Sequence, residues 1–279
     1  MIKPFILVFL AAPSVAVGQA ASDMGWSYSG KLTAVWAGGN SQSSTFGLGS
    51  MLRRLGERAE LTFETGAIRT DASLRTRRAV GTASAYTIEE DEDNQKTAES
   101  YFARARQGWK VKDNIVAFAG ADWLRNTFAG IDSRTLFATG VGNVWSNSET
   151  FKFKTDLGVT YTFQQDVVEN PFVKSNFPGV RFAWDLQRAL SKTSKWESTL
   201  VSDLNLDDTE DLRFDFSNGL PVSISNRLSL KPALQLLWRN RPALTNVDLF
   251  TPLGTSSGQV QVPLQKLDSF FTLALVVTL

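Results

Sequence analysis

The chain has 279 residues, and its 29 basic and 28 acidic side chains nearly cancel, with no block of one sign that would indicate nucleic-acid binding. It contains no histidine and no cysteine. These absences exclude Ser-His-Asp catalysis, imidazole metal ligation, thiol catalysis, disulfide bonds and lipidation at a cleavage-site cysteine, and we expect no cofactor and no metal.

The first twenty residues have the pattern of a secretory signal peptide. Lys3 precedes an apolar stretch, Pro4–Val17, and Gly18 and Ala20 form a small-x-small cleavage pattern. A cut after Ala20 leaves residues 21–279 as a single mature domain. No long apolar run follows, which excludes a helical membrane protein.

A two-residue rhythm runs through the mature chain. Apolar residues alternate with polar or small ones, as they do in strands and not in helices. The clearest case is Phe151–Phe163, where aromatic and aliphatic residues alternate with Lys, Asp, Gly and Thr. The predicted strands, in chain order, are Trp26–Ala37, Ser44–Arg53, Ala59–Arg69, Tyr101–Lys110, Ile115–Arg125, Arg134–Trp145, Phe151–Phe163, Val180–Gln187, Trp196–Leu206, Leu212–Leu220, Leu228–Trp238 and Leu267–Leu279.

About twelve such strands, each of roughly 10–14 residues, are long enough to cross a bilayer when tilted. The predicted fold is all-β: a transmembrane, antiparallel, up-and-down β-barrel with short periplasmic turns and longer outer loops. A soluble sandwich is the alternative. The short connections alternate with the longer ones, and lie at Arg54–Glu57, Lys112–Asn114, Ser146–Glu149, Ser191–Lys195 and Val222–Asn226. The longest connections fall on the opposite side, at Thr70–Thr97, Gln165–Pro178 and Arg239–Gln265, and the first of these is read as a long loop with strand extensions at its base.

Tryptophan supports the barrel over the sandwich. In a membrane barrel, tryptophans gather at strand ends, at the two bilayer interfaces, whereas a sandwich buries them near strand middles. Only Trp184 lies further inside its predicted strand. The tryptophans predicted at the membrane interface are Trp26, Trp36, Trp109, Trp123, Trp145, Trp196 and Trp238.

Two stretches resemble a known family. Ser29–Ser41, with the sequence SGKLTAVWAGGNS, resembles the opening strand and Gly-Asn turn of the salt-induced outer-membrane proteins, domain of unknown function 481. Asn126–Arg134, followed by Gly140-Val141-Gly142, resembles that family's central loop and glycine-bearing strand. The resemblance covers most of the mature chain. It implies a barrel in the outer membrane of a Gram-negative bacterium, mostly without an assigned activity, and a salt response is implied only by the family's name.

Charged residues of both signs share the polar face of neighbouring predicted strands. We expect opposite charges on adjacent strands to pair, to fix the register and to narrow the lumen. The candidate lumen-lining residues are Glu60, Glu64, Arg104, Arg106, Lys110, Lys152, Lys154, Asp156, Arg181 and Asp185. The alternative is acid–base catalysis by paired carboxylates. The cationic neighbours of each carboxylate favour the ion-pair lattice, so we assign no catalytic residue and rank an outer-membrane enzyme last.

Two acidic segments, Glu89–Asp93 and Asp207–Asp211, fall on the predicted outer side. Carboxylate clusters can hold Ca²⁺ or Mg²⁺, and Arg75, Arg77 and Arg78 can contact lipopolysaccharide phosphates. The reading we favour is a solvated loop.

The sequence therefore favours a monomeric, non-catalytic outer-membrane barrel that contributes to envelope integrity or to a salt response, with a narrow polar lumen. The alternative is a porin-like channel for small solutes or ions with a charged constriction. The expected partners are outer-membrane lipid, lipopolysaccharide and the barrel assembly machinery.

Overall fold

The computed structural model describes residues 24–37, 41–82, 85–93, 98–170, 174–250, 256–264 and 266–278. The predicted signal peptide lies outside the described residues.

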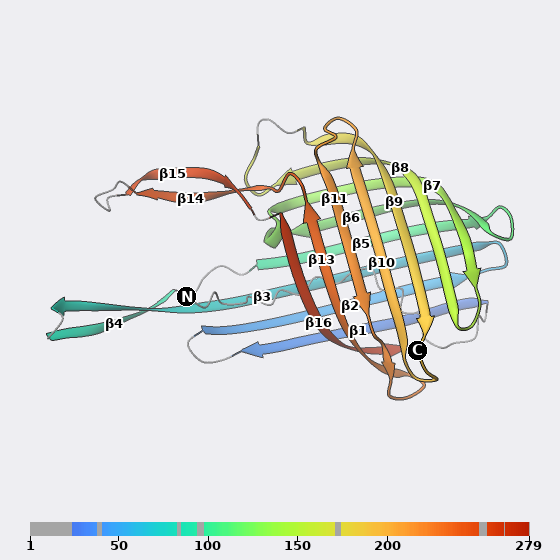
Figure 1. Ribbon diagram of the computed structural model, residues 1–279, viewed down its shortest axis with the longest axis horizontal. Helices are drawn as coiled ribbons and strands as arrows, with labels where there is room; N and C mark the ends of the chain where they lie inside the picture. The colour runs from blue at the N-terminus through green and yellow to red at the C-terminus, as the bar shows by residue number, and fades with distance from the viewer. Residues whose placement is uncertain are drawn as a thin grey trace.

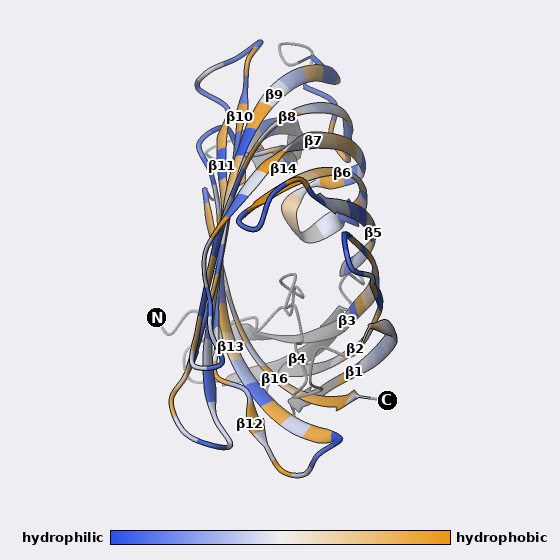
Figure 2. Cartoon of the chain, turned by 90° about the vertical axis from the view of Figure 1, so that its right-hand side faces the viewer, coloured by the Kyte–Doolittle hydropathy of each residue, from blue (hydrophilic) through white to orange (hydrophobic). Residues whose placement is uncertain are grey.

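Within the described residues, twelve antiparallel strands pair in a closed ring (Figures 1 and 2). Each strand pairs with the next one along the ring, and the last pairs with the first, with Ser29 opposite Thr278 and Leu32 opposite Leu275. The predicted all-β, up-and-down barrel is therefore confirmed. The ring consists of β1 (Gly25–Ala37), β2 (Ser41–Leu55), β3 (Ala59–Thr82), β5 (Ala98–Lys110), β6 (Ile115–Asn126), β7 (Ile131–Asn147), β8 (Phe151–Asp166), β9 (Asn176–Ala189), β10 (Lys195–Asn205), β11 (Leu212–Gly219), β13 (Leu228–Arg239) and β16 (Leu267–Thr278).

Two hairpins extend beyond the ring at the same end of the barrel, toward the left of Figure 1. One joins the outer part of β3 to β4 (Ala85–Asp93), and the other joins β14 (Leu244–Phe250) to β15 (Ser256–Pro263). We call this end the hairpin rim, and the opposite end, which carries the short connections, the turn rim. A 3₁₀ turn, η1 (Thr127–Ala129), lies between β6 and β7, and β12 (Val222–Ser223) pairs with β13.

The predicted long loop at Thr70–Thr97 is wrong in its main part, because the chain continues as a β-hairpin. Its register sets basic positions of β3 opposite acidic positions of β4: Arg75 pairs with Glu92 and Arg77 with Glu90. Positions of opposite charge thus face each other along this hairpin, a register that favours antiparallel pairing in a polar segment. The predicted loop at Arg239–Gln265 likewise contains the β14–β15 hairpin.

The two faces of β16 differ as the alternation predicts. On β16, Phe271 and Leu273 are 50% and 49% exposed, whereas Thr272 and Ala274 are 5% and 1% exposed. Large apolar side chains are exposed around the whole ring, among them Leu48, Phe63, Phe137, Leu157 and Leu234, each on a different strand. Among the described residues, no helix is long and apolar enough to cross a membrane.

The predicted interface tryptophans differ in exposure. The side chains of Trp26, Trp109, Trp123, Trp145 and Trp196 are exposed. Trp238 is half-buried, with its ring centroid 5.4 Å from that of Phe214. Trp123 and Trp238 also form part of the wall of the interior cavity. The side chain of Trp36 lies outside the described part of the structure. A membrane interface at these positions stays a prediction.

Candidate functional site

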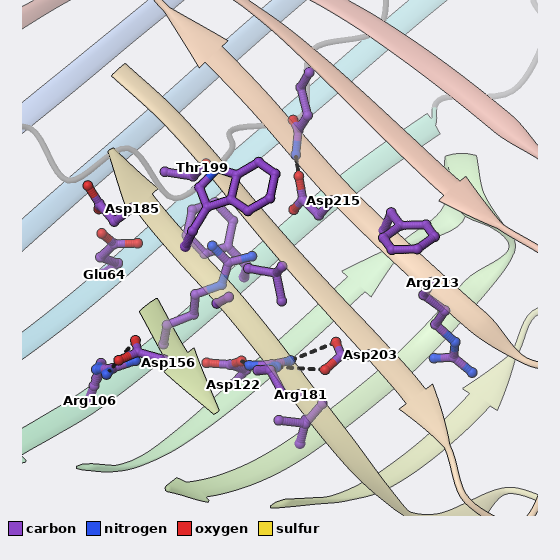
Figure 3. Close-up of a pocket in the computed structure, with 18 of the residues that line it drawn as sticks. Glu64, Arg106, Asp122, Asp156, Arg181, Asp185, Thr199, Asp203, Arg213 and Asp215 are labelled. Atoms are coloured by element: carbon purple, nitrogen blue, oxygen red, sulfur yellow. Dashed lines mark hydrogen bonds and ion pairs between the residues drawn. The ribbon is translucent and has the colours of Figure 1, made fainter. Parts of the chain in front are cut away.

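The interior of the barrel holds a cavity of about 850 Å³ whose wall carries charged side chains of both signs (Figure 3). The structure places the following predicted lumen residues in this wall: Glu60, Glu64, Arg104, Arg106, Lys152, Lys154, Asp156, Arg181 and Asp185. Lys110 is not part of it. As the last residue of β5 it lies at the turn rim, where its Nζ is 3.2 Å from an Asp113 carboxylate oxygen.

Opposite charges face each other in register along the wall. Arg104 on β5 lies opposite Glu64 on β3 and opposite Asp122 on β6. Lys154 on β8 lies opposite Asp185 on β9. A slip of one residue in either pair would turn these charges toward the apolar exterior, so their alternation with apolar residues specifies the register.

Arg181 is the centre of the ion pairs that cross the interior. Its Nε and Nη2 donate to the two carboxylate oxygens of Asp203 on β10 at 2.7 and 2.9 Å. Its Nη1 donates to Asp122 on β6 at 2.9 Å, although β7 and β8 lie between β6 and β9 in the sheet. Figure 3 shows the guanidinium between the two carboxylates. This bridge therefore spans part of the lumen instead of lying along the wall.

A second bridge joins β5 to β8. Arg106 Nη2 donates to Asp156 at 2.8 Å, and its guanidinium lies 3.9 Å from the centroid of the Phe118 ring. Two glycines on the inner face leave space for these side chains. A Cβ on Gly142 would lie 2.1 Å from the Asp156 carboxylate, and a Cβ on Gly158 would lie 3.2 Å from the Phe118 ring. The glycine-bearing strands thus allow long side chains to lie across the interior.

A third ion pair is almost fully enclosed. Lys231 on β13 binds Glu197 on β10, across the intervening β11, and their side chains are 7% and 10% exposed. A lone charge at this depth would be strongly destabilising, so each group depends on the other.

Several charged residues of the interior were not among the lumen residues predicted from the sequence. They are Asp122, Arg134, Glu197, Asp203, Arg213, Asp215, Lys231 and Arg239. In β6 both faces are mostly small or apolar, with Ala117, Ala119 and Ala121 against Val116 and Phe118, so the inner face could not be identified. The pairing of β6 with β5 identifies it, because Asp122 falls opposite Arg104.

At the hairpin rim, a contact between opposite walls crosses the mouth of the barrel. Gly130 follows η1, between β6 and β7, and adopts a left-handed backbone conformation with φ +70°. A Cβ at Gly130 would lie 2.7 Å from Cβ of Ala243 and 3.0 Å from Cδ1 of Leu264, which form the base of the β14–β15 hairpin. That hairpin connects β13 to β16, on the other side of the ring, so the contact crosses the mouth.

The predicted acidic turn at the hairpin rim is held by cations of the chain itself. Arg241 binds Asp208 at 2.8 Å and Glu210 at 2.6 Å, and Lys174 binds Asp207 at 3.0 Å. The Arg241 hydrogen bond holds the pKa of Glu210 below its usual value. In the described residues, no group of three or more acidic side chains is arranged to hold a metal ion.

Asp211 ends this turn and is almost completely buried. It accepts hydrogen bonds from Arg213, and Arg239 lies 3.4 Å away. Burial is the largest single effect and raises the pKa of Asp211, but the hydrogen bonds and charge of Arg213, the charge of Arg239 and a hydrogen bond from Asn205 together outweigh it, and the pKa lies below its usual value.

Comparison with known proteins gives a family match and one curated relative. The model of a family described as "Protein of unknown function, DUF481" matches residues 31–253. Over 152 residues the chain is 22% identical to the uncharacterized protein YdiY of Escherichia coli (strain K12). That stretch is 54% of this chain and 57% of YdiY, so the match spans just over half of the relative.

Solved barrel structures are similar only at a low level. An outer membrane channel from Pseudomonas putida F1 matches with a TM-score of 0.42 and 11% identity, over 100% of both chains. The translocator domain of the autotransporter NalP from Neisseria meningitidis matches with a TM-score of 0.41 and 11% identity, over 90% of this chain and 86% of that one. At these scores nothing follows about a solute or a transported molecule.

Proposed function

The chain belongs to the DUF481 family, whose description gives no function, and from the features of its barrel we propose that it is a non-catalytic outer-membrane protein of the cell envelope. Its lumen is narrowed by ion pairs, so that small ions pass and larger solutes do not. The bridge from Arg181 to Asp122 is the observation that carries this proposal.

The exterior supports the membrane location. Apolar side chains such as Leu157 and Val159 are 56% and 59% exposed on the outward face of β8, and similar residues continue around the ring. An apolar surface of this extent is unfavourable in water and is the surface that lipid requires. We place the hairpin rim outward, toward lipopolysaccharide, and we propose insertion as a monomer by the barrel assembly machinery of a Gram-negative cell.

The ion pairs in the interior support restricted passage of solutes through the lumen. Arg181 and Arg106 each bind a carboxylate beyond two intervening strands, so each bridge divides the cross-section of the lumen at its own level. A charge-assisted hydrogen bond to a partly buried carboxylate is stronger than a neutral one, so these bridges persist while water fills the remaining space.

Planar-bilayer recording with the purified protein tests this function. We expect small, steady conductance steps, and liposomes carrying the protein should not swell in isotonic disaccharide. Large steps with disaccharide uptake would contradict the narrowed lumen. Recovery of the protein in the soluble fraction without detergent would contradict the membrane location.

The second candidate is a porin-like channel with a defined solute. The cavity of about 850 Å³, with its charged wall, is the observation that favours it. Saturable uptake of one solute into liposomes would distinguish this function from passage of ions alone.

The absence of catalysis and the role in the envelope are also proposals. Asp156 is engaged by Arg106 and Lys154, and Glu60 by Arg53, so these carboxylates are occupied as counterions. A contribution to salt tolerance is tested by deleting the gene and comparing growth at high salt and in detergent. Unchanged growth in both would contradict the envelope role.

A further inference from the structure

Arg134 is an interior arginine without an ion pair among the described residues. Arg134, on the inner face of β7, lines the cavity, yet it makes no hydrogen bond or ion pair within the described part of the chain. A guanidinium carries five N–H donors and remains charged in proteins, so one that lines the cavity without an acceptor from the protein can offer its donors to a ligand.

The surroundings of Arg134 are rich in arginine. The charged groups that act most strongly on it are Arg213, Asp203, Arg181 and Arg239. Three of these four are cations. The fourth, Asp203, already accepts two hydrogen bonds from Arg181.

The other carboxylates of this region are also engaged. Asp211 accepts from Arg213, Asp166 accepts from Gln164 at 2.6 Å, and Asp215 accepts from Gln235 at 2.7 Å. None of them is bonded to Arg134. The wall thus supplies several guanidiniums near Arg134, and among the described residues no acceptor is bonded to it.

A second arginine offers a free donor in the same region. Nη1 of Arg239 is buried and has no hydrogen-bond partner, while Nε of the same side chain lies 3.4 Å from Asp211. Arg239 is among the groups that act on Arg134. Both side chains line the cavity, and the strand register connects them: Gln164 lies opposite Arg134 and accepts a hydrogen bond from Arg213 at 2.9 Å, and Arg213 lies opposite Arg239.

From this arrangement we propose that Arg134 and Arg239 form a binding site for a small oxyanion, a carboxylate or a phosphate, in the hairpin-rim half of the lumen. The planar guanidinium fork matches two oxygens of either group. The nearby Asp203 and Asp215 disfavour a ligand of high charge, so the site takes small anions. Binding at this site does not require that the lumen conduct ions. Only the route by which a ligand reaches the site through the lumen rests on the proposed function.

The test uses the full-length protein in detergent. Inorganic phosphate and acetate are titrated calorimetrically and in thermal unfolding, with chloride holding the ionic strength constant. A ligand that binds only the folded state raises the melting temperature with concentration. We expect saturable binding of at least one oxyanion by the wild-type protein, and a dissociation constant at least tenfold higher in Arg134→Gln.

Arg53→Gln is the matched control. Arg53 lines the same cavity from the turn-rim end of β2, but its Nε is paired with Glu60 at 2.7 Å. Its removal should leave oxyanion binding unchanged. Arg134→Gln removes an unpaired charge, so it should fold at least as well as the wild type without ligand. Arg239→Gln gives an independent test, with weaker binding expected.

Two results would overturn the site: no saturable oxyanion binding by the wild type, or equal binding by wild type and Arg134→Gln. Conductance is recorded on the same preparations. A protein that binds phosphate without conducting ions would refute the proposed ion passage and leave the binding site standing. A protein that conducts ions but shows no saturable oxyanion binding would refute the site and leave the ion passage standing.

Discussion

Arg181 on β9 holds Asp122 on β6 at 2.9 Å across two intervening strands, while the rest of its guanidinium is held by Asp203 on the neighbouring β10. The two carboxylates therefore differ in role. Asp203 neutralises Arg181 along the wall, and Asp122 fixes it across the lumen.

This difference can be measured with single substitutions. Asp122→Ala should release the bridge while Arg181 keeps its pair with Asp203, so bilayer conductance should rise and stability should fall by about 1.5–2 kcal/mol. Asp203→Ala removes two hydrogen bonds to a partly buried cation and should cost about 3 kcal/mol. Lys110→Gln, at the turn rim, is the control. Equal conductance of Asp122→Ala and the wild type would show that the bridge does not narrow the lumen.

The enclosed pair of Lys231 and Glu197 should behave as a unit. Glu197→Leu leaves the ammonium group of Lys231 without a counterion and should destabilise the barrel by about 3–5 kcal/mol. Adding Lys231→Met should recover most of that loss, because no lone charge then remains. Denaturant unfolding in detergent of both single variants and the double variant gives the coupling energy. Purely additive losses would contradict the pairing.

The lipid-facing surface can be tested by placing a charge on it. Leu157 lies in the middle of β8 and is 56% exposed. Leu157→Arg should cost about 2–4 kcal/mol of folding free energy in lipid vesicles, as arginine does near the bilayer midplane. Leu190→Arg, just beyond the end of β9 at the turn rim, should cost about 0–1 kcal/mol. If both variants fold equally well into vesicles, the exterior of β8 does not face lipid.

The contact across the mouth depends on a glycine. Gly130→Ala should lose about 1–3 kcal/mol, because alanine is strained at φ +70° and its Cβ would lie 2.7 Å from that of Ala243. Adding Ala243→Gly should recover the steric part and leave the backbone strain. Gly30→Ala, whose new Cβ would meet only ordinary contacts from 3.7 Å outward, serves as the control. Thermal unfolding in detergent measures all three, and a neutral Gly130→Ala would contradict the close approach.

The acidic turn at the hairpin rim should loosen in acid. Folding lowers the pKa of Glu210, through Arg241, and that of Asp211, where Arg213, Arg239 and Asn205 together outweigh the effect of burial. A lowered pKa in the folded state favours the ionised form, so this stabilisation is complete above the usual carboxylate pKa range and is lost as pH falls through the lowered values. Amide hydrogen exchange in the turn should therefore accelerate at low pH. In Arg241→Met, amide exchange in the turn should begin to accelerate at a higher pH than in the wild type. An unchanged dependence of exchange on pH would contradict the role of Arg241.

The strands and their faces were predictable because alternation is a local property. The exposed Phe271 and buried Ala274 follow from the last strand alone, as does the charged inner face of β8. The bridges were not predictable, since Asp122 meets Arg181 only through the closure and curvature of the sheet. Alternation also fails where both faces look alike, as in β6, and where charges replace apolar residues, as in the β3–β4 hairpin.

The junction of Gly130 with Ala243 and Leu264 has a consequence for the order of assembly. It joins segments far apart in sequence and on opposite sides of the ring, so it cannot form until the C-terminal strands have been added. A cysteine pair introduced at neighbouring positions would therefore crosslink only in barrels that have finished closing, and would report the last step of biogenesis.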